Sequence, residues 1–117
     1  MEVKDQNYQV NFDSDTATVT FQGSLRLSGM EEYKPIVELL NQVNEMDYET
    51  INLDLKELEF LNSSGISVLS KFVISVRKKK STSILIKGSK GVPWQGKSLK
   101  NLQRLMPTLI LELEELE

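Results

Sequence analysis

The strongest pattern of apolar and polar positions runs over residues 51–80. In residues 51–56 apolar and polar side chains alternate, which is the period of two expected of a strand that buries one face. A polar turn at 62–65 follows, and apolar residues then recur at spacings of three and four, at Ile66, Leu69, Phe72, Val73 and Val76. This spacing predicts an amphipathic helix, which ends in four cations at 77–80 that suit the negative end of a helix dipole.

The N-terminal part predicts a hairpin. Residues 8–12 and 16–21 alternate apolar with polar or β-branched side chains, and Asp13-Ser14-Asp15 between them is typical of a turn. Asp13 and Asp15 have the D-x-D spacing of a calcium loop, but the glycine and the distal glutamate of such a loop do not follow. We therefore expect no metal site.

A loop over 23–29 leads to a second predicted helix, in which apolar residues recur between Tyr33 and Val43. Ser28 and Glu31 have the spacing of a capping box. Because proline is comfortable only in a first helical turn, Pro35 requires either a helix that begins near Glu32 or an irregular lead-in capped by Ser28.

The C-terminal part predicts a strand over 82–87, a helix over 98–106 and a last strand over 108–113. Three consecutive apolar residues at 84–86 suit a strand that is buried on both faces. Two strands flanking the helix that follows the 62–65 turn form a βαβ unit, which requires a parallel pair and a right-handed crossover. The chain is thus expected to be one α/β domain over residues 1–117, with a mixed sheet of about five strands in the order β-β-α-β-α-β-α-β.

Composition excludes several classes of function. A net charge of −3 argues against a nucleic-acid binder, and no apolar run approaches the length that spans a bilayer. The chain has no cysteine and no histidine, so disulfides, Ser-His-Asp and Cys-His catalysis and histidine-ligated zinc are not available to it. We expect a cytoplasmic protein that is not an enzyme and has no cofactor.

The two serines of the central turn admit two interpretations. Ser63 or Ser64 can cap the helix by accepting hydrogen bonds from its first free N–H groups. Alternatively, one of them is an exposed hydroxyl for modification, because a phosphate there would gain from the helix dipole and the free N–H groups. The pattern alone leaves both interpretations open.

The segment 91–98 matches the G-x-x-x-x-G-K-S pattern of a phosphate-binding loop, in which Gly96, Lys97 and Ser98 would contact a nucleotide. Too little chain follows for the strand and acidic residue that hold magnesium in such proteins, and Pro93 removes one N–H group. Nucleotide binding is therefore the weakest of the functions considered. Trp94 in this loop is expected to pack against the domain, and the alternative is an exposed anchor for a protein partner.

An apolar strand, the segment Phe-Leu-Asn-Ser-Ser-Gly-Ile at 60–66 and a following helix resemble the STAS domain of bacterial anti-sigma-factor antagonists. The usual turn of that family is Asp-Ser-Ser/Thr-Gly-Leu, and a partner kinase phosphorylates the first serine after the acid. The resemblance implies phosphorylation at Ser63, with Ser64 as the alternative. It also implies a partner surface formed by Asn62, Ser63, Ser64, Gly65 and Ile66.

The same resemblance implies that Arg26 and Ser28 lie near the partner surface. The expected partners are an anti-sigma-type serine kinase and a serine phosphatase, with no nucleic acid and no membrane, and the oligomeric state stays open. Many STAS domains carry a final helix that is not expected here. The family's acid is Asn62 in this chain, which motivates a second hypothesis, a constitutive STAS-type scaffold without phosphorylation.

Overall fold

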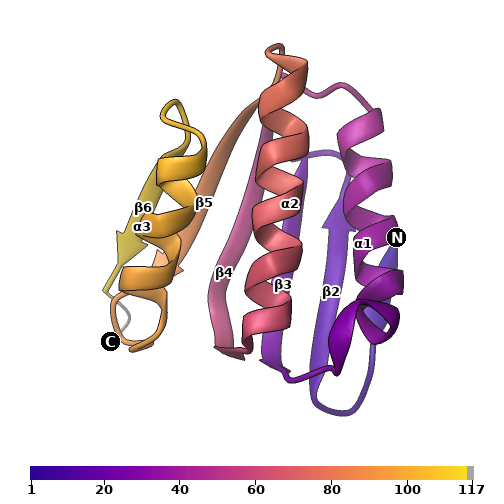
Figure 1. Cartoon of the computed structure of the whole chain (residues 1–117), viewed down its shortest axis with the longest axis vertical. Helices are drawn as coiled ribbons and strands as arrows, with labels where there is room; N and C mark the ends of the chain where they lie inside the picture. Colours follow the sequence, from indigo (N-terminus) through magenta and orange to yellow (C-terminus); the bar gives the residue numbers. More distant parts are fainter. Residues whose placement is uncertain (116–117) are drawn as a thin grey trace.

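The computed structural model describes residues 1–115 and shows one mixed sheet with three helices on one of its faces (Figure 1). The elements in chain order are β1 (Glu2–Lys4), β2 (Tyr8–Asp13), β3 (Thr18–Leu25), α1 (Gly29–Glu45), β4 (Thr50–Leu61), α2 (Ser63–Lys79), β5 (Ser83–Ser89), α3 (Gln95–Leu105) and β6 (Ile110–Glu114). The strands lie side by side in sequence order, from β1 to β6.

The sheet combines antiparallel and parallel pairing. β1–β2 and β2–β3 are antiparallel, whereas β3, β4, β5 and β6 are mutually parallel and are joined by the helices. The predicted α/β class, the mixed sheet, the hairpin and the parallel unit around α2 are confirmed. The short strand β1 was not predicted, because three residues carry too little alternation to distinguish a strand from a loop.

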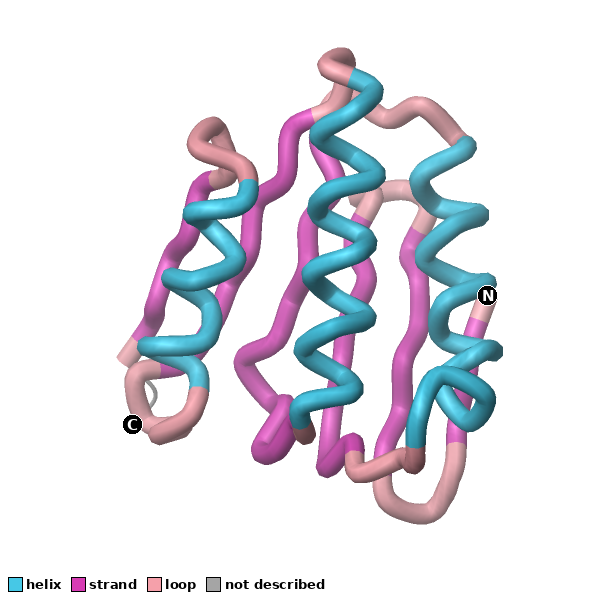
Figure 2. Tube along the Cα trace, viewed as in Figure 1, coloured by secondary structure: helices cyan, strands magenta, loops and turns pink. Residues whose placement is uncertain are grey.

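The hydrophobic core lies between the sheet and the helices, all of which cover the same face (Figure 2). Val19, Leu53 and Ile86 on neighbouring strands are fully buried beneath α1 and α2. The prediction that the strand around 84–86 is buried on both faces is wrong, because Leu85 is half-buried on the face that carries no helix. None of the helices within residues 1–115 is long and apolar enough to cross a lipid bilayer.

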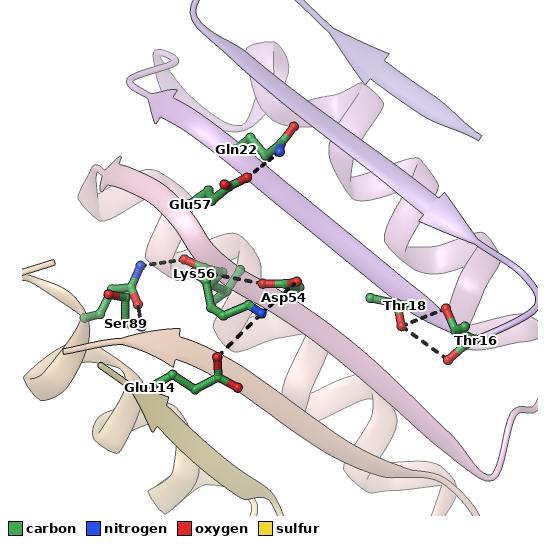
Figure 3. A network of polar contacts seen from close by, with 10 residues as sticks. Thr16, Thr18, Gln22, Asp54, Lys56, Glu57, Ser89 and Glu114 are labelled. Carbon is green, nitrogen blue, oxygen red and sulfur yellow. Dashed lines mark hydrogen bonds and ion pairs between the residues drawn. The ribbon is translucent and has the colours of Figure 1, made fainter. Parts of the chain in front are cut away.

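The open face of the sheet carries a network of polar side chains (Figure 3). The Lys56 ammonium group lies 3.6 Å from the Glu114 carboxylate and 3.9 Å from that of Asp54. Across β3 and β4, Gln22 donates a hydrogen bond of 2.5 Å to Glu57. Such partly exposed pairs each contribute at most about 1 kcal/mol, so they add little to the stability of the fold.

The second half of β4 bends away from β5. Pairing with β5 covers only Thr50–Asp54, and the pairing of β4 with β3 shifts twice beyond that point. Each shift inserts one extra residue into β4, so its buried residues change from a spacing of two to a spacing of three, at Leu55, Leu58 and Leu61. The bulges leave backbone groups of β4 without a partner strand.

Gln95 fills the gap between β4 and β5. Its side-chain amide is fully buried, donates to the carbonyl oxygens of Leu55 (2.6 Å) and Leu58 (3.0 Å), and accepts from the N–H of Ser89 (2.7 Å). One side chain thereby replaces the missing ladder bonds, which would otherwise leave buried groups unpaired. Trp94 beside it packs against the core, as predicted, and its indole N–H donates to the Leu58 carbonyl (3.2 Å).

The start of α1 differs from the predicted capping box. Ser28 occupies the N-cap position, but its side chain makes no capping hydrogen bond. The carboxylate that accepts from the Ser28 N–H (2.9 Å) belongs to Glu32, one residue later than predicted. Regular helix begins at Gly29, so Pro35 lies inside α1 and not in its first turn.

Candidate functional site

The candidate site is the turn between β4 and α2, at the end of the sheet where β3 and β4 finish together. Leu25 and Leu61 are paired in the last register position of the two strands, and the N–H of Asn62 donates to the Leu25 carbonyl (3.2 Å). This pairing places the β3–α1 loop, which includes Arg26 and Ser28, beside the start of α2 (Figure 2).

Asn62 connects three segments at this point. Its side-chain Oδ1 accepts from the N–H of Gly65 (2.9 Å) and from the hydroxyl of Tyr33 in α1 (2.7 Å). Its Nδ2 donates to the carbonyl of Leu27 in the β3–α1 loop (2.8 Å). The bond from the Gly65 N–H is an N-cap. The bond to the Leu27 carbonyl requires an amide, because a carboxylate has no hydrogen to donate. The structure therefore gives a physical reason for asparagine at this position.

Gly65 is required by close packing. A Cβ atom at Gly65 would lie 2.2 Å from Cδ1 of Leu61 and 2.7 Å from the hydroxyl oxygen of Tyr33. Both neighbours are themselves buried, so a side chain at position 65 would force the packing around it to shift. The glycine of the turn thus lets α2 begin directly against the end of β4.

The two serines lie at the first and second positions of α2. Ser63 is exposed and Ser64 is half-buried. The interpretation of either serine as the helix cap is wrong, because Asn62 is the N-cap residue and its side chain makes the capping bond. The hydroxyl of Ser63 is thus an exposed group at the positive end of a 17-residue helix with no acidic residue in its first turn.

An exposed aromatic residue lies close to this turn. The guanidinium carbon of Arg26 stands 4.4 Å from the ring centroid of Phe60, and 37% of Phe60 is exposed. Arg26 also lines a cavity of about 350 Å³ together with Asp5, Asn7, Tyr8 and Ser24. Arg26 thus lies at the end of the sheet that carries the 62–66 turn, where the resemblance predicts a partner surface, and Phe60 lies beside it. The alternation of β4 did not single out Phe60, because the second bulge decides which way it faces.

Two tyrosines near the site have raised pKa values. Burial is the main cause of the raised pKa of Tyr33, and a hydrogen bond with the backbone of Leu27 partly offsets it. Burial followed by the nearby carboxylates of Asp5 and Glu32 raises the pKa of Tyr8. Both phenols are therefore neutral at physiological pH, and Tyr33 acts as a hydrogen-bond donor to Asn62.

The nucleotide-binding residues that the G-x-x-x-x-G-K-S pattern suggests lie in α3 and not in the turn between β4 and α2. Gly96, Lys97 and Ser98 form the first turn of α3, which begins at the same end of the molecule as α2 (Figure 1). Gln95, inside the matching segment, is directed into the core to bridge β4 and β5. Nucleotide binding stays a prediction that rests on the pattern alone. No group of three or more acidic side chains that could hold a metal ion occurs within residues 1–115.

Comparison with known proteins identifies the fold. No protein-family model matches the sequence, and no characterised protein matches it by sequence. Among solved structures, the fold is similar to SiaC of Pseudomonas aeruginosa, with a TM-score of 0.73 at 10% identity over 99% of this chain and 98% of that one. An anti-sigma factor antagonist from Mycobacterium paratuberculosis has a TM-score of 0.66 at 16% identity, over 94% and 90% of the two chains.

These similarities define the class: the chain has a STAS-like fold, as the resemblance of the 60–66 segment predicted. A further solved structure contains SiaC bound to the diguanylate cyclase SiaD, of which SiaC is the activator. It matches this chain with a TM-score of 0.73 at 10% identity, over 99% of each chain.

Proposed function

We propose that this chain is a phosphorylation-switchable interaction domain of the anti-sigma-factor-antagonist type. In its unphosphorylated form it binds a cognate serine kinase or anti-sigma regulator through the turn at Asn62–Ile66. Phosphorylation of Ser63 by that kinase releases it, and a serine phosphatase restores binding. The protein acts in bacterial signal transduction and transcription control, in the cytoplasm.

The observation that carries the proposal is the exposed Ser63 hydroxyl at the start of α2, left free because Asn62 supplies the helix cap. Phosphorylation would add about two negative charges at this surface. In a partner interface such charges act by repulsion and by the cost of removing water from them. The nearby Arg26 and Phe60 provide the type of side chains that anchor protein interfaces.

The first test is phosphopeptide mass spectrometry on protein isolated from its native host. Trypsin releases residues 57–71 as one peptide, which contains Ser63, Ser64, Ser67 and Ser70. We expect phosphate on Ser63. Phosphate on Ser64 alone would keep the switch and change the residue. An unmodified peptide under several growth conditions, with the kinase shown to be expressed, would contradict the switch.

A variant series separates charge from structure. Ser63→Glu is expected to weaken binding of the regulator, whereas Ser63→Ala preserves it. Ser67→Glu is the matched control, because Ser67 is also exposed on α2 but lies one helical turn further along. Equal weakening by Ser63→Glu and Ser67→Glu would contradict a specific role of Ser63.

The second candidate is a constitutive STAS scaffold without phosphorylation. The observation that favours it is that both polar side-chain atoms of Asn62 are hydrogen-bonded within the domain, so the turn is held together without a charged group. Under this alternative Ser63→Glu would change partner binding only as far as it changes thermal stability. Measuring both quantities on the same variant distinguishes the two candidates.

A further inference from the structure

The charges of this chain are strongly segregated. Between Phe60 and Leu111 the sequence has ten of the fourteen lysines and arginines and no aspartate or glutamate. This stretch forms α2, β5 and α3. A protein with a net charge of −3 therefore has two neighbouring helices without a single carboxylate.

Five of these cations are exposed on the two helices, and we call them together the basic helical face: Lys71, Lys78, Lys97, Lys100 and Arg104. Lys71 lies at the edge of this set, where it lines a cavity with Met30 and Asn41 of α1. Lys71 and Lys78 are seven residues apart on α2, and Lys97, Lys100 and Arg104 have spacings of three and four on α3, so each set shares one side of its helix. The two helices run side by side on the sheet (Figure 1). None of the five forms an ion pair with another residue of the described range 1–115.

The face also has features of a docking surface besides charge. Ile74 lies between Lys71 and Lys78 on the same side of α2 and is half-exposed, outside the buried core. Near the C-terminal ends of α2 and α3 there is a cavity of about 410 Å³, lined by Arg77, Lys80, Met106 and Pro107 among others. The face thus combines unpaired cations with an apolar residue and a nearby cavity. This combination suits a partner that is acidic and partly apolar.

We propose that the basic helical face binds an acidic amphipathic helix of a partner protein. The proposal rests on the proposed function only in that this chain binds a protein, and it does not require phosphorylation of Ser63. The partner helix would place its carboxylates against the cations of α2 and α3 and an apolar side chain against Ile74. Attraction between the two charged surfaces would speed association and make it sensitive to salt.

The surroundings of the face disfavour other polyanions. Glu31, Glu38 and Glu45 are exposed at intervals of seven along α1, on the other side of α2. This acidic row would repel a duplex lying across the helices, whereas a single helix over α2 and α3 avoids it. An anionic membrane is disfavoured because the large exposed apolar residues of the described chain, among them Met30 and Phe60, all lie outside α2 and α3.

The test compares two variants that lose the same charge. Lys97→Gln/Lys100→Gln/Arg104→Gln removes three cations from the face, and Lys4→Gln/Lys34→Gln/Lys87→Gln removes three from β1, α1 and β5. The probe is a fluorescent synthetic helix with glutamates along one side and leucines along the other, titrated by anisotropy at low and high salt. Amide NMR shifts of labelled protein locate the binding, and circular dichroism checks that both variants fold.

We expect the face variant to bind the peptide at least about tenfold more weakly and the control variant to change by less than about twofold, with shift changes in α2 and α3. Equal losses in the two variants, or no binding at low salt, would overturn the proposal. Tighter binding of a short DNA duplex or of phosphatidylserine vesicles than of the peptide would also overturn it. So would self-association of the protein alone, measured by sedimentation, that the face variant abolishes. These outcomes are independent of the phosphorylation state of Ser63.

Discussion

Replacing Asn62 by aspartate changes only the side-chain amide nitrogen to an oxygen, and so it isolates the bond to Leu27. The two bonds that Oδ1 accepts, from the Gly65 N–H and the Tyr33 hydroxyl, remain possible. The bond from Nδ2 to the Leu27 carbonyl, 2.8 Å in length, is lost. In its place a carboxylate oxygen faces a carbonyl oxygen, and neither can donate a hydrogen.

The size of the effect follows from two opposing contributions. A partly buried carbonyl left without a donor costs about 1–3 kcal/mol. A negative charge at the start of α2 recovers about 0.3–1 kcal/mol through the helix dipole. We therefore expect Asn62→Asp to lower the free energy of unfolding by about 1–2 kcal/mol at pH 7, a drop in Tm of roughly 4–8 °C for a domain of this size.

The loss of stability in Asn62→Asp is expected to depend on pH. The protonated carboxyl can again donate to Leu27, so folding raises its pKa above the value of about 3.9 in an unfolded chain. A group whose pKa is raised by folding contributes stability below its unfolded pKa and loses it as the pH rises through its folded pKa. The deficit of the variant relative to wild type should therefore be largest at neutral pH and shrink on acidification, as measured by thermal unfolding followed by circular dichroism.

Two matched variants control this experiment. Asn62→Ala removes all three bonds and should cost about 2–4 kcal/mol at every pH, because it loses the cap and leaves partners unpaired. Tyr33→Phe removes the bond from α1 and leaves the bond to Leu27 in place. If Asn62→Asp were as stable as wild type at pH 7, or if its deficit grew on acidification, the reasoning that the Leu27 carbonyl needs an amide donor would be refuted.

Three further predictions concern other parts of the fold. Gln95→Ala should lower the free energy of unfolding in urea by about 2 kcal/mol or more, because it leaves the buried Leu55 carbonyl and Ser89 N–H unpaired, while the Leu58 carbonyl keeps its bond from Trp94; a loss under 1 kcal/mol would indicate that water replaces the amide. Lys80→Gly should raise the free energy of unfolding by about 0.5–1 kcal/mol and Tm by a few degrees, because Lys80 ends α2 with a φ of 61°, a conformation that glycine adopts without strain. The advantage of wild type over Tyr33→Phe should shrink as the pH rises above about 10, because the raised pKa of Tyr33 means that folding opposes its ionisation; a constant advantage from pH 8 to 11 would contradict this.

The elements that the sequence predicts well are those whose periodicity is undisturbed. The central strand, the helix of 63–79 and the parallel strand after it follow from alternation and from spacings of three and four. The strand around 84–86 shows the limit of such predictions. Three apolar residues in a row indicate an apolar strand, but they do not indicate how many of its faces are covered. That depends on where all three helices lie, which is a property of the whole topology.

The bonds that position the site could not be predicted from local patterns. Asn62 contacts Leu27 and Tyr33, which are 35 and 29 residues away in sequence, so its role depends on the pairing of β3 with β4. A weak signal for Gln95 was present, since it precedes Leu99 by four residues on the apolar stripe of α3. A polar residue at a buried helix position requires partners, and the spacing of three between Leu55, Leu58 and Leu61 already indicates an irregular strand that could supply them.

The geometry of the turn determines how phosphorylation at Ser63 would act. Asn62 ties the start of α2 to the β3–α1 loop and to α1, and Gly65 packs against Leu61 with no free space. Each of these contacts uses groups other than the Ser63 hydroxyl, so a phosphate on that hydroxyl would leave them intact. The helix dipole would also favour the added charge. A modification that preserves the fold of the turn can change partner binding only through its charge and its size at the surface. We therefore expect phosphorylated and unmodified protein to share one backbone structure around Asn62, which comparison of amide NMR shifts at Leu27 and Gly65 would test.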